Sequence, residues 1–170
     1  MPNLKFTLKA WPVIAVATIG LCYLTQTVAK LVGIDLPDQQ NIELVRQWLS
    51  RAFDSTKAFA TCAFLLLQVL VLLPVLEEVV FRFLLFRLPA RHLPFSARRG
   101  LVACALVSSL AFSAAHYVFQ PFPDAAFVAL FFFGLAQCWL YARTDRLWCP
   151  MLNHFLFNLT NLLLLFVLPQ

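Results

Sequence analysis

Glu77-Glu78-Val79-Val80-Phe81-Arg82 is the stretch that decides the fold, because it places three charged side chains inside an apolar run that extends from Ala58 to Phe86. An ionised side chain near the centre of a bilayer costs on the order of 2.5 to 3.5 kcal/mol on insertion scales. Three of them so close together therefore require mutual pairing, contact with water, or a function.

The spacing within this stretch predicts different tasks for its two carboxylates. On a helix, residues four apart share one face, whereas adjacent residues project about 100° apart. Glu78 is therefore expected to pair with Arg82, which leaves Glu77 as the spare carboxylate. Pro74 lies three residues before Glu77 and is expected to kink the helix or to free a backbone carbonyl near the carboxylates.

The composition predicts an all-α, polytopic membrane helix bundle. Of the 170 residues, 62% are hydrophobic and only 12% are charged, which is too apolar for an ordinary soluble domain. We expect one integral-membrane domain over residues 1–170, without a separate polar domain. Apolar runs long enough to cross a bilayer predict about five spans, at roughly 10–32, 58–86, 100–119, 125–142 and 148–168.

An amphipathic segment lies between the first two spans. Its apolar residues recur at helical spacing, opposite a charged and polar face, at Ile42, Val45, Trp48, Leu49, Ala52 and Phe53. This pattern predicts one interfacial helix. Anchoring at the outer surface is the role that we favour over substrate capture.

The distribution of charge predicts an orientation and no nucleic-acid partner. The net charge is +5, but four of the basic residues lie in segment 87–99, which has no acidic residue, and the turn at 143–147 holds Arg143 and Arg146. Segment 33–57 has four acidic residues against three basic ones. Because basic residues near span ends mark the cytoplasmic side, we expect the N-terminus, 87–99 and 143–147 to be cytoplasmic. Five spans then place the C-terminus outside a cell (inner) membrane.

Two histidines and an asparagine fall inside the later spans. His116 lies in the third span, at the end of the stretch from Phe112 to His116. His154 and Asn158 lie on one helix face in the last span. At about 1.5 Å of rise per residue, these side chains and Glu77 reach similar depths, so one shared cavity is expected. Ser113, Ala114 and Ala115 would let a neighbouring helix approach closely. Each polar residue alone could be structural, as could Gln68, Gln137 and Asn161.

This set of side chains suits water activation and acyl hydrolysis. A carboxylate can take a proton from water, and a histidine opposite it can share that water. Hydrolysis of a peptide bond also needs hydrogen-bond donors for the developing oxyanion. An imidazole N–H and an asparagine N–H, one helical turn apart, would supply two.

The three motifs EExxxR, FxxxH and HxxxN occur in this order at Glu77 to Arg82, Phe112 to His116 and His154 to Asn158. Together they resemble the CAAX-protease and bacteriocin-processing (Abi) family of intramembrane proteases, over a catalytic core at 58–168. The resemblance implies a glutamic-type endopeptidase without a metal or other cofactor. It implies that Glu77 and His116 activate water, that His154 and Asn158 form the oxyanion hole, and that Glu78, Arg82 and Phe112 support the site.

The resemblance also suggests a substrate and shows two departures. A membrane-anchored protein or peptide is implied, and some small relatives look dedicated to cutting C-terminal sorting tails, as in JDVT-CTERM-type systems. Many relatives have glycine where this chain has Phe83 and Ser113, which affects the expected helix packing more than the chemistry. Only one span precedes the motif core.

Three alternatives compete with this hypothesis. A zinc-dependent protease could use Glu77, His116 and His154 as ligands with an open fourth position, but the chain lacks HExxH and gives Asn158 no role. A membrane binding or immunity protein of the same fold would need no catalysis. A transporter is disfavoured, because the chain has no internal repeat that could form inverted halves.

Overall fold

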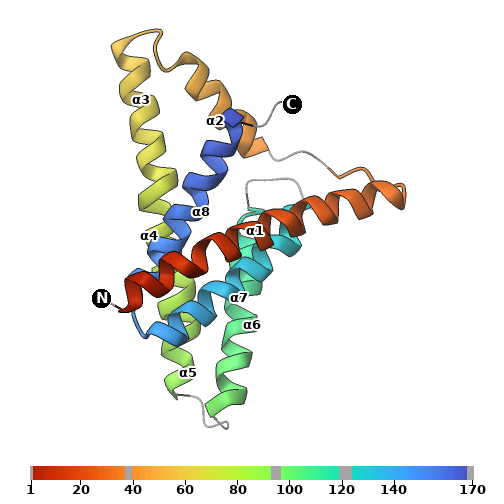
Figure 1. The fold of residues 1–170 in the computed structure, drawn as a ribbon, viewed down its shortest axis with the longest axis vertical. Helices are drawn as coiled ribbons and strands as arrows, with labels where there is room; N and C mark the ends of the chain where they lie inside the picture. The colour runs from red at the N-terminus through yellow and green to blue at the C-terminus, as the bar shows by residue number, and fades with distance from the viewer. Residues whose placement is uncertain (1, 37–39, 93–96, 119–123, 168–170) are drawn as a thin grey trace.

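The computed structural model describes residues 2–36, 40–92, 97–118 and 124–167, and all the regular structure in these ranges is helical (Figure 1). The elements in chain order are α1 (Pro2–Leu31), α2 (Gln40–Arg51), α3 (Thr56–Leu67), η1 (Gln68–Leu72), α4 (Leu73–Glu77), η2 (Glu78–Arg87), α5 (Leu88–His92), α6 (Ala97–Ala115), α7 (Ala126–Thr144) and α8 (Trp148–Val167). The predicted all-α membrane bundle is confirmed.

The elements α3 to α5 form one continuous helical rod of 37 residues, from Thr56 to His92. Two of its segments, η1 and η2, are π-helices, in which a backbone N–H bonds to the carbonyl five residues earlier. The Leu73 N–H, for example, donates to the Gln68 carbonyl. π-Helical turns are rare and are often found at functional sites. Here η2 contains Glu78 and Arg82, and Glu77 directly precedes it.

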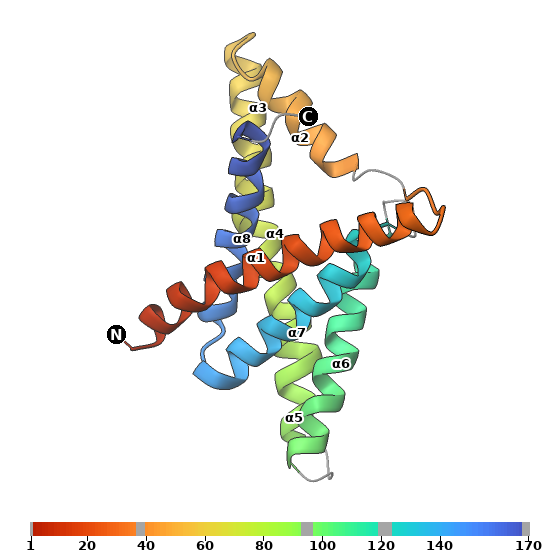
Figure 2. The same ribbon diagram turned by 45° about the vertical axis from the view of Figure 1, so that its right-hand side comes forward.

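The other helices pack around the middle and one end of this rod. Figure 1 shows α8 beside the rod and α6 along its lower part, and Figure 2 shows α1 lying across α7 and α8. A buried cluster joins α1, α6, α7 and α8, consisting of Ile14, Ala15, Phe112, Phe133 and Phe157. The polar site described below lies against this apolar core.

α6 and α7 approach each other closely at Ser109 and Gly134. A Cβ atom at position 134 would lie 2.9 Å from the Ser109 Cβ, so only glycine allows this packing. The expected contact through residues 113–115 is only partly correct. Ser113 is buried and donates to the Phe127 carbonyl at 2.7 Å, but Ala114 and Ala115 are exposed.

Four helical segments are long and apolar enough to cross a membrane, at Pro2–Leu31, Thr56–His92, Arg98–Ala115 and Ala126–Thr144. They correspond to the first four predicted spans. The fifth, α8, forms a helix close to the predicted range, but it is not among these segments within the described residues. This helix carries three polar side chains, Asn153, His154 and Asn158.

The predicted amphipathic helix is α2, which packs against α3. Ala52 is buried and Trp48 half-buried, whereas Phe53 is 87% exposed. The side chain of Ile42 lies outside the described residues. A hollow of about 390 Å³ lies between α2 and α3, next to Trp48 and Arg51.

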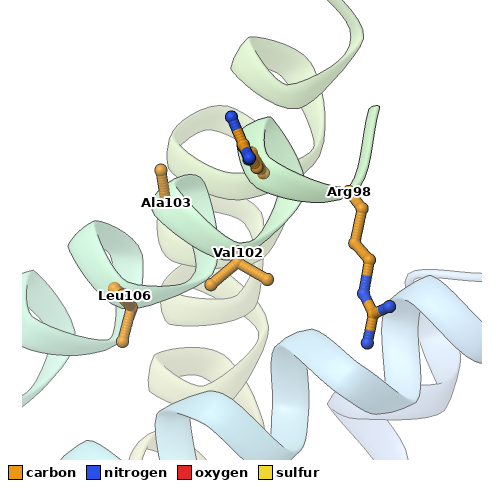
Figure 3. A pocket seen from close by; sticks show the side chains of 5 residues that line it. Arg98, Val102, Ala103 and Leu106 are labelled. Carbon is orange, nitrogen blue, oxygen red and sulfur yellow. The ribbon is translucent and has the colours of Figure 1, made fainter. Parts of the chain in front are cut away.

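A second hollow, of about 340 Å³, lies near the start of α6 (Figure 3). It is lined by Arg98, Arg99, Val102, Ala103 and Leu106. Neither of these two hollows includes Glu77 or Glu78.

The three segments expected on the cytoplasmic side meet at one end of the molecule. Arg87 pairs with Asp145 at 2.5 Å, and Arg91 lies 3.7 Å from the same carboxylate oxygen. The Asn3 amide approaches the Thr144 carbonyl at 3.5 Å. The N-terminus, the start of segment 87–99 and the turn at 143–147 therefore lie on the same side.

Candidate active site

Glu78 and Arg82 form the predicted ion pair on η2. The Arg82 Nε lies 3.2 Å from the Glu78 Oε2, and both side chains are completely buried. The distance satisfies an ion pair, although the angle at these atoms does not meet hydrogen-bond geometry. The two charges stabilise each other in a region where neither could remain alone.

The Arg82 guanidinium also contacts an aromatic ring. Its Cζ lies 4.3 Å from the centroid of the buried Phe112 ring, within the range of a cation–π interaction. Within the described residues, the two terminal nitrogens of Arg82 have no hydrogen-bond partner. The Phe112 ring therefore provides a second contact for the charge of Arg82.

His154 on α8 connects the two carboxylates. Its Nδ1 lies 2.8 Å from the Glu78 Oε1, and its Nε2 lies 3.6 Å from the Glu77 Oε2. An ionised carboxylate only accepts hydrogen bonds, so the contact with Glu78 places a proton on Nδ1 and turns Nε2 toward Glu77. The second distance is longer than a direct hydrogen bond.

The two carboxylates differ in their access to solvent. The Glu77 side chain is 27% exposed, whereas the Glu78 side chain is completely buried. The predicted division between a paired and a spare carboxylate agrees with this difference. Glu77 is thus the carboxylate that an incoming molecule can reach.

His116 directly follows the end of α6 and lies next to the Phe112 ring. Its Nδ1 is 2.9 Å from the Phe112 carbonyl, and its ring centroid is 4.7 Å from that of Phe112. The Phe112 ring also lies 5.9 Å from the His154 ring. Within the described residues, His116 makes no direct hydrogen bond or ion pair with Glu77, and the Phe112 ring is the group that contacts both histidines.

Asn158 is bound to the backbone of the π-helical rod. Its Nδ2 donates to the Val69 carbonyl at 2.9 Å. In the π-helical pattern, the donor for this carbonyl would be the backbone nitrogen of residue 74, which is a proline and has no N–H. Pro74 therefore leaves this carbonyl without a backbone donor, as one of the two predicted effects, and Asn158 satisfies it; the carbonyl lies eight residues before Glu77 along the chain.

Two buried amides complete the site, and sequence reasoning gave them no functional part. Gln137 on α7 lies 3.4 Å from Glu78 through its Nε2, and Asn153 on α8 donates to the Gln137 Oε1 at 2.9 Å. Gln137 therefore bonds across the bundle, which is the structural role that its sequence position allowed. Asn161 instead donates to the Phe157 carbonyl in its own helix. In the sequence, the feature that could have indicated a functional role for Asn153 is its position directly before His154 in an apolar span.

The two departures from the family pattern leave the polar site open. Phe83 is 37% exposed and therefore does not crowd the carboxylates. The Ser113 hydroxyl binds the backbone of α7. Among the described residues, no group of three or more histidine, cysteine, aspartate or glutamate side chains could hold a metal ion.

Comparison with known families identifies the family of the chain. Residues 59–160 match the family described as "Rce1-like: Type II CAAX prenyl endopeptidase Rce1-like". The match covers more than half of the chain and includes all three motifs, so the chain belongs to the Rce1-like family. It is thus a multi-pass membrane protein and a CAAX-type intramembrane peptidase. No curated protein and no solved structure gave a match.

The contact between Asn158 and Val69 predicts a dependence on Pro74. Asn158→Ala leaves a carbonyl without a donor and should destabilise the protein by about 1 to 3 kcal/mol. In a Pro74→Ala background, the new N–H can bind Val69, so the same substitution should cost less. Thermal unfolding in detergent of the four members of this double-mutant cycle measures the coupling, and equal losses in both backgrounds would contradict the assignment.

Proposed function

We propose that this protein is a glutamic-type endopeptidase that hydrolyses a peptide bond in a membrane-associated protein without a metal cofactor. The observation that carries the proposal is the position of His154, whose two ring nitrogens face Glu78 and Glu77. One carboxylate thereby fixes the imidazole, and the other, more exposed, remains for the substrate and water. Against zinc, the chain lacks HExxH, and a zinc site would give Asn158 no role.

In the proposed reaction, Glu77 accepts a proton from water, with His116 as the second group that orients this water. The resulting hydroxide attacks the carbonyl carbon of the peptide bond and forms a tetrahedral intermediate. This intermediate collapses with cleavage of the C–N bond, and the proton held by Glu77 passes to the leaving amine. The negative charge that develops on the carbonyl oxygen is met by an N–H at the His154 Nε2, present when the ring is doubly protonated, and by the second amide hydrogen of Asn158. The Glu78 carboxylate stabilises the charged imidazole.

The substrate is proposed to be a membrane-anchored protein or peptide that approaches through the bilayer. The matched family is named for prenyl endopeptidases, so a lipid-modified C-terminal segment is one form of this class. A C-terminal sorting tail of an exported protein, as in JDVT-CTERM-type systems, is the form that we favour for a chain of 170 residues. Comparing membrane proteomes with and without the gene would reveal the uncleaved substrate.

The two carboxylates should be separable by mutation. Glu77→Gln preserves shape and removes the base, so it should abolish cleavage while the protein accumulates normally. Glu78→Gln unpairs the buried Arg82 and should reduce the amount of folded protein, because breaking a buried pair typically costs about 3 to 5 kcal/mol. Cleavage assays and size-exclusion profiles of both variants measure these effects.

Two results would contradict this assignment. A stable but inactive Glu78→Gln together with an unstable Glu77→Gln would mean that the roles are reversed. If Glu77→Gln retains the full biological effect in cells, a membrane binding or immunity protein is the better account.

The oxyanion role of Asn158 is best tested in the Pro74→Ala background, where its structural contact matters less. There, Asn158→Ala should lower kcat by about 10²- to 10³-fold with little change in KM, because the contact strengthens in the transition state. Steady-state kinetics in liposomes, with Pro74→Ala alone as the control, decide this. A rise in KM at constant kcat would instead assign Asn158 to substrate binding.

The proposed orientation places the end that holds Arg87, Asp145 and the N-terminus in the cytoplasm of a cell with an inner membrane. The predicted fifth span then places the C-terminus outside. A reporter fused after Gln170 should be active outside the cytoplasm, and one inserted near Pro94 should be active inside. The opposite pattern would overturn the orientation, and a cytoplasmic reporter at both positions would mean that α8 does not cross the membrane.

A further inference from the structure

A chain of buried amides leads from α8 through α7 to Glu78. The Asn153 Nδ2 donates to the Gln137 Oε1 at 2.9 Å, and the Gln137 Nε2 lies 3.4 Å from the Glu78 Oε1. The same Nε2 donates to the Pro150 carbonyl at 3.0 Å. Both amide side chains are completely buried, where an unpaired polar group would be costly.

The direction of this chain follows from chemistry. A backbone carbonyl only accepts hydrogen bonds, so the contact with Pro150 requires Gln137 to turn its NH₂ group toward Pro150 and Glu78. Its oxygen then faces Asn153 and accepts from the amide there. Both amides therefore donate in the direction of Glu78.

Glu78 receives contacts from three elements. Its Oε1 faces His154 on α8 and Gln137 on α7, and its Oε2 faces Arg82 on η2. A carboxylate that is held only by an ion pair can turn about its last bond. The added contact from Gln137 restricts this turn, and the contact from Asn153 restricts Gln137.

We propose that Gln137 and Asn153 are positioning residues, which hold Glu78 so that His154 keeps a proton on Nδ1 and directs Nε2, the nitrogen that donates once the ring is doubly protonated, toward Glu77 and the developing oxyanion. The catalytic consequence rests on the proposed function, but the tautomer itself does not. Loss of the amide chain would let Glu78 turn away from His154. The imidazole would then also populate the tautomer that carries its proton on Nε2, in which Nδ1 no longer donates to Glu78.

The test uses the full-length protein in detergent and three buried substitutions. Gln137→Met keeps the length of the side chain and removes both of its hydrogen-bonding groups. Asn153→Leu removes only the contact to Gln137 and leaves Gln137 in place, so it carries the test if Gln137→Met does not fold. Leu140→Met is the matched control, since Leu140 is completely buried on the same helix and lies outside the amide chain.

The first measurement is ¹⁵N NMR of the histidine side chains, which reports the tautomer without any cleavage. Wild type and Leu140→Met should show His154 protonated at Nδ1, and Gln137→Met and Asn153→Leu should show a mixture of tautomers. His92 and His116 serve as internal references, because their Nδ1 atoms lie 2.8 and 2.9 Å from backbone carbonyls. A wild-type His154 protonated only at Nε2, or unchanged signals in a folded variant, would overturn the proposal.

The second measurement is turnover. Gln137→Met should lower kcat about tenfold with KM unchanged, as outer-shell partners of catalytic groups often do, and should shift the pH profile. The double variant Gln137→Met with Asn153→Leu should have a kcat no lower than that of Gln137→Met alone, because both residues act through Glu78. Additive losses would overturn the shared route. If wild type cleaves no substrate but the NMR signals change as expected, the proposed function fails and the positioning role stands.

Discussion

The buried charge of Glu78 is the constraint on which the rest of the structure depends. Removing a carboxylate and a guanidinium from water costs several kcal/mol for each ion, and their mutual attraction offsets this only with good geometry and further hydrogen bonds. Arg82 on η2, Gln137 on α7 and His154 on α8 all face this carboxylate. Three helical elements are therefore held together at the point where we propose the chemistry, so stability and positioning would have a common origin.

The same rule applies to the backbone of the rod. Within a bilayer, a free carbonyl has no water to bind and must be satisfied by the protein. Pro74 removes the donor that the Val69 carbonyl would have in the π-helical pattern, and Asn158 replaces it. One asparagine thus fixes α8 against the rod four residues after His154, which keeps the histidine in register with the two carboxylates.

Whether a feature of the fold or the site can be predicted from the sequence depends on how far apart in the chain the interacting residues lie. The helices and the pair between Glu78 and Arg82 follow from local rules, since apolar runs and a spacing of four residues are properties of one segment. The contacts of Gln137 and Asn153 depend on how α7 and α8 are rotated against the rod, which no local pattern contains. The same limit applies to the close helix packing at Gly134, which the small residues at 113–115 do not predict.

Two adjacent glutamates, identical in chemistry, come to differ through their neighbours alone. Their directions differ by about 100° on the helix, which turns Glu78 into the bundle among Arg82, His154 and Gln137 and leaves Glu77 partly exposed. Glu78 is held by contacts from three elements, whereas Glu77 has one distant partner, the His154 ring, and keeps part of its side chain exposed. The order of the pair along the chain thus sets which carboxylate stabilises the fold and which remains available to react.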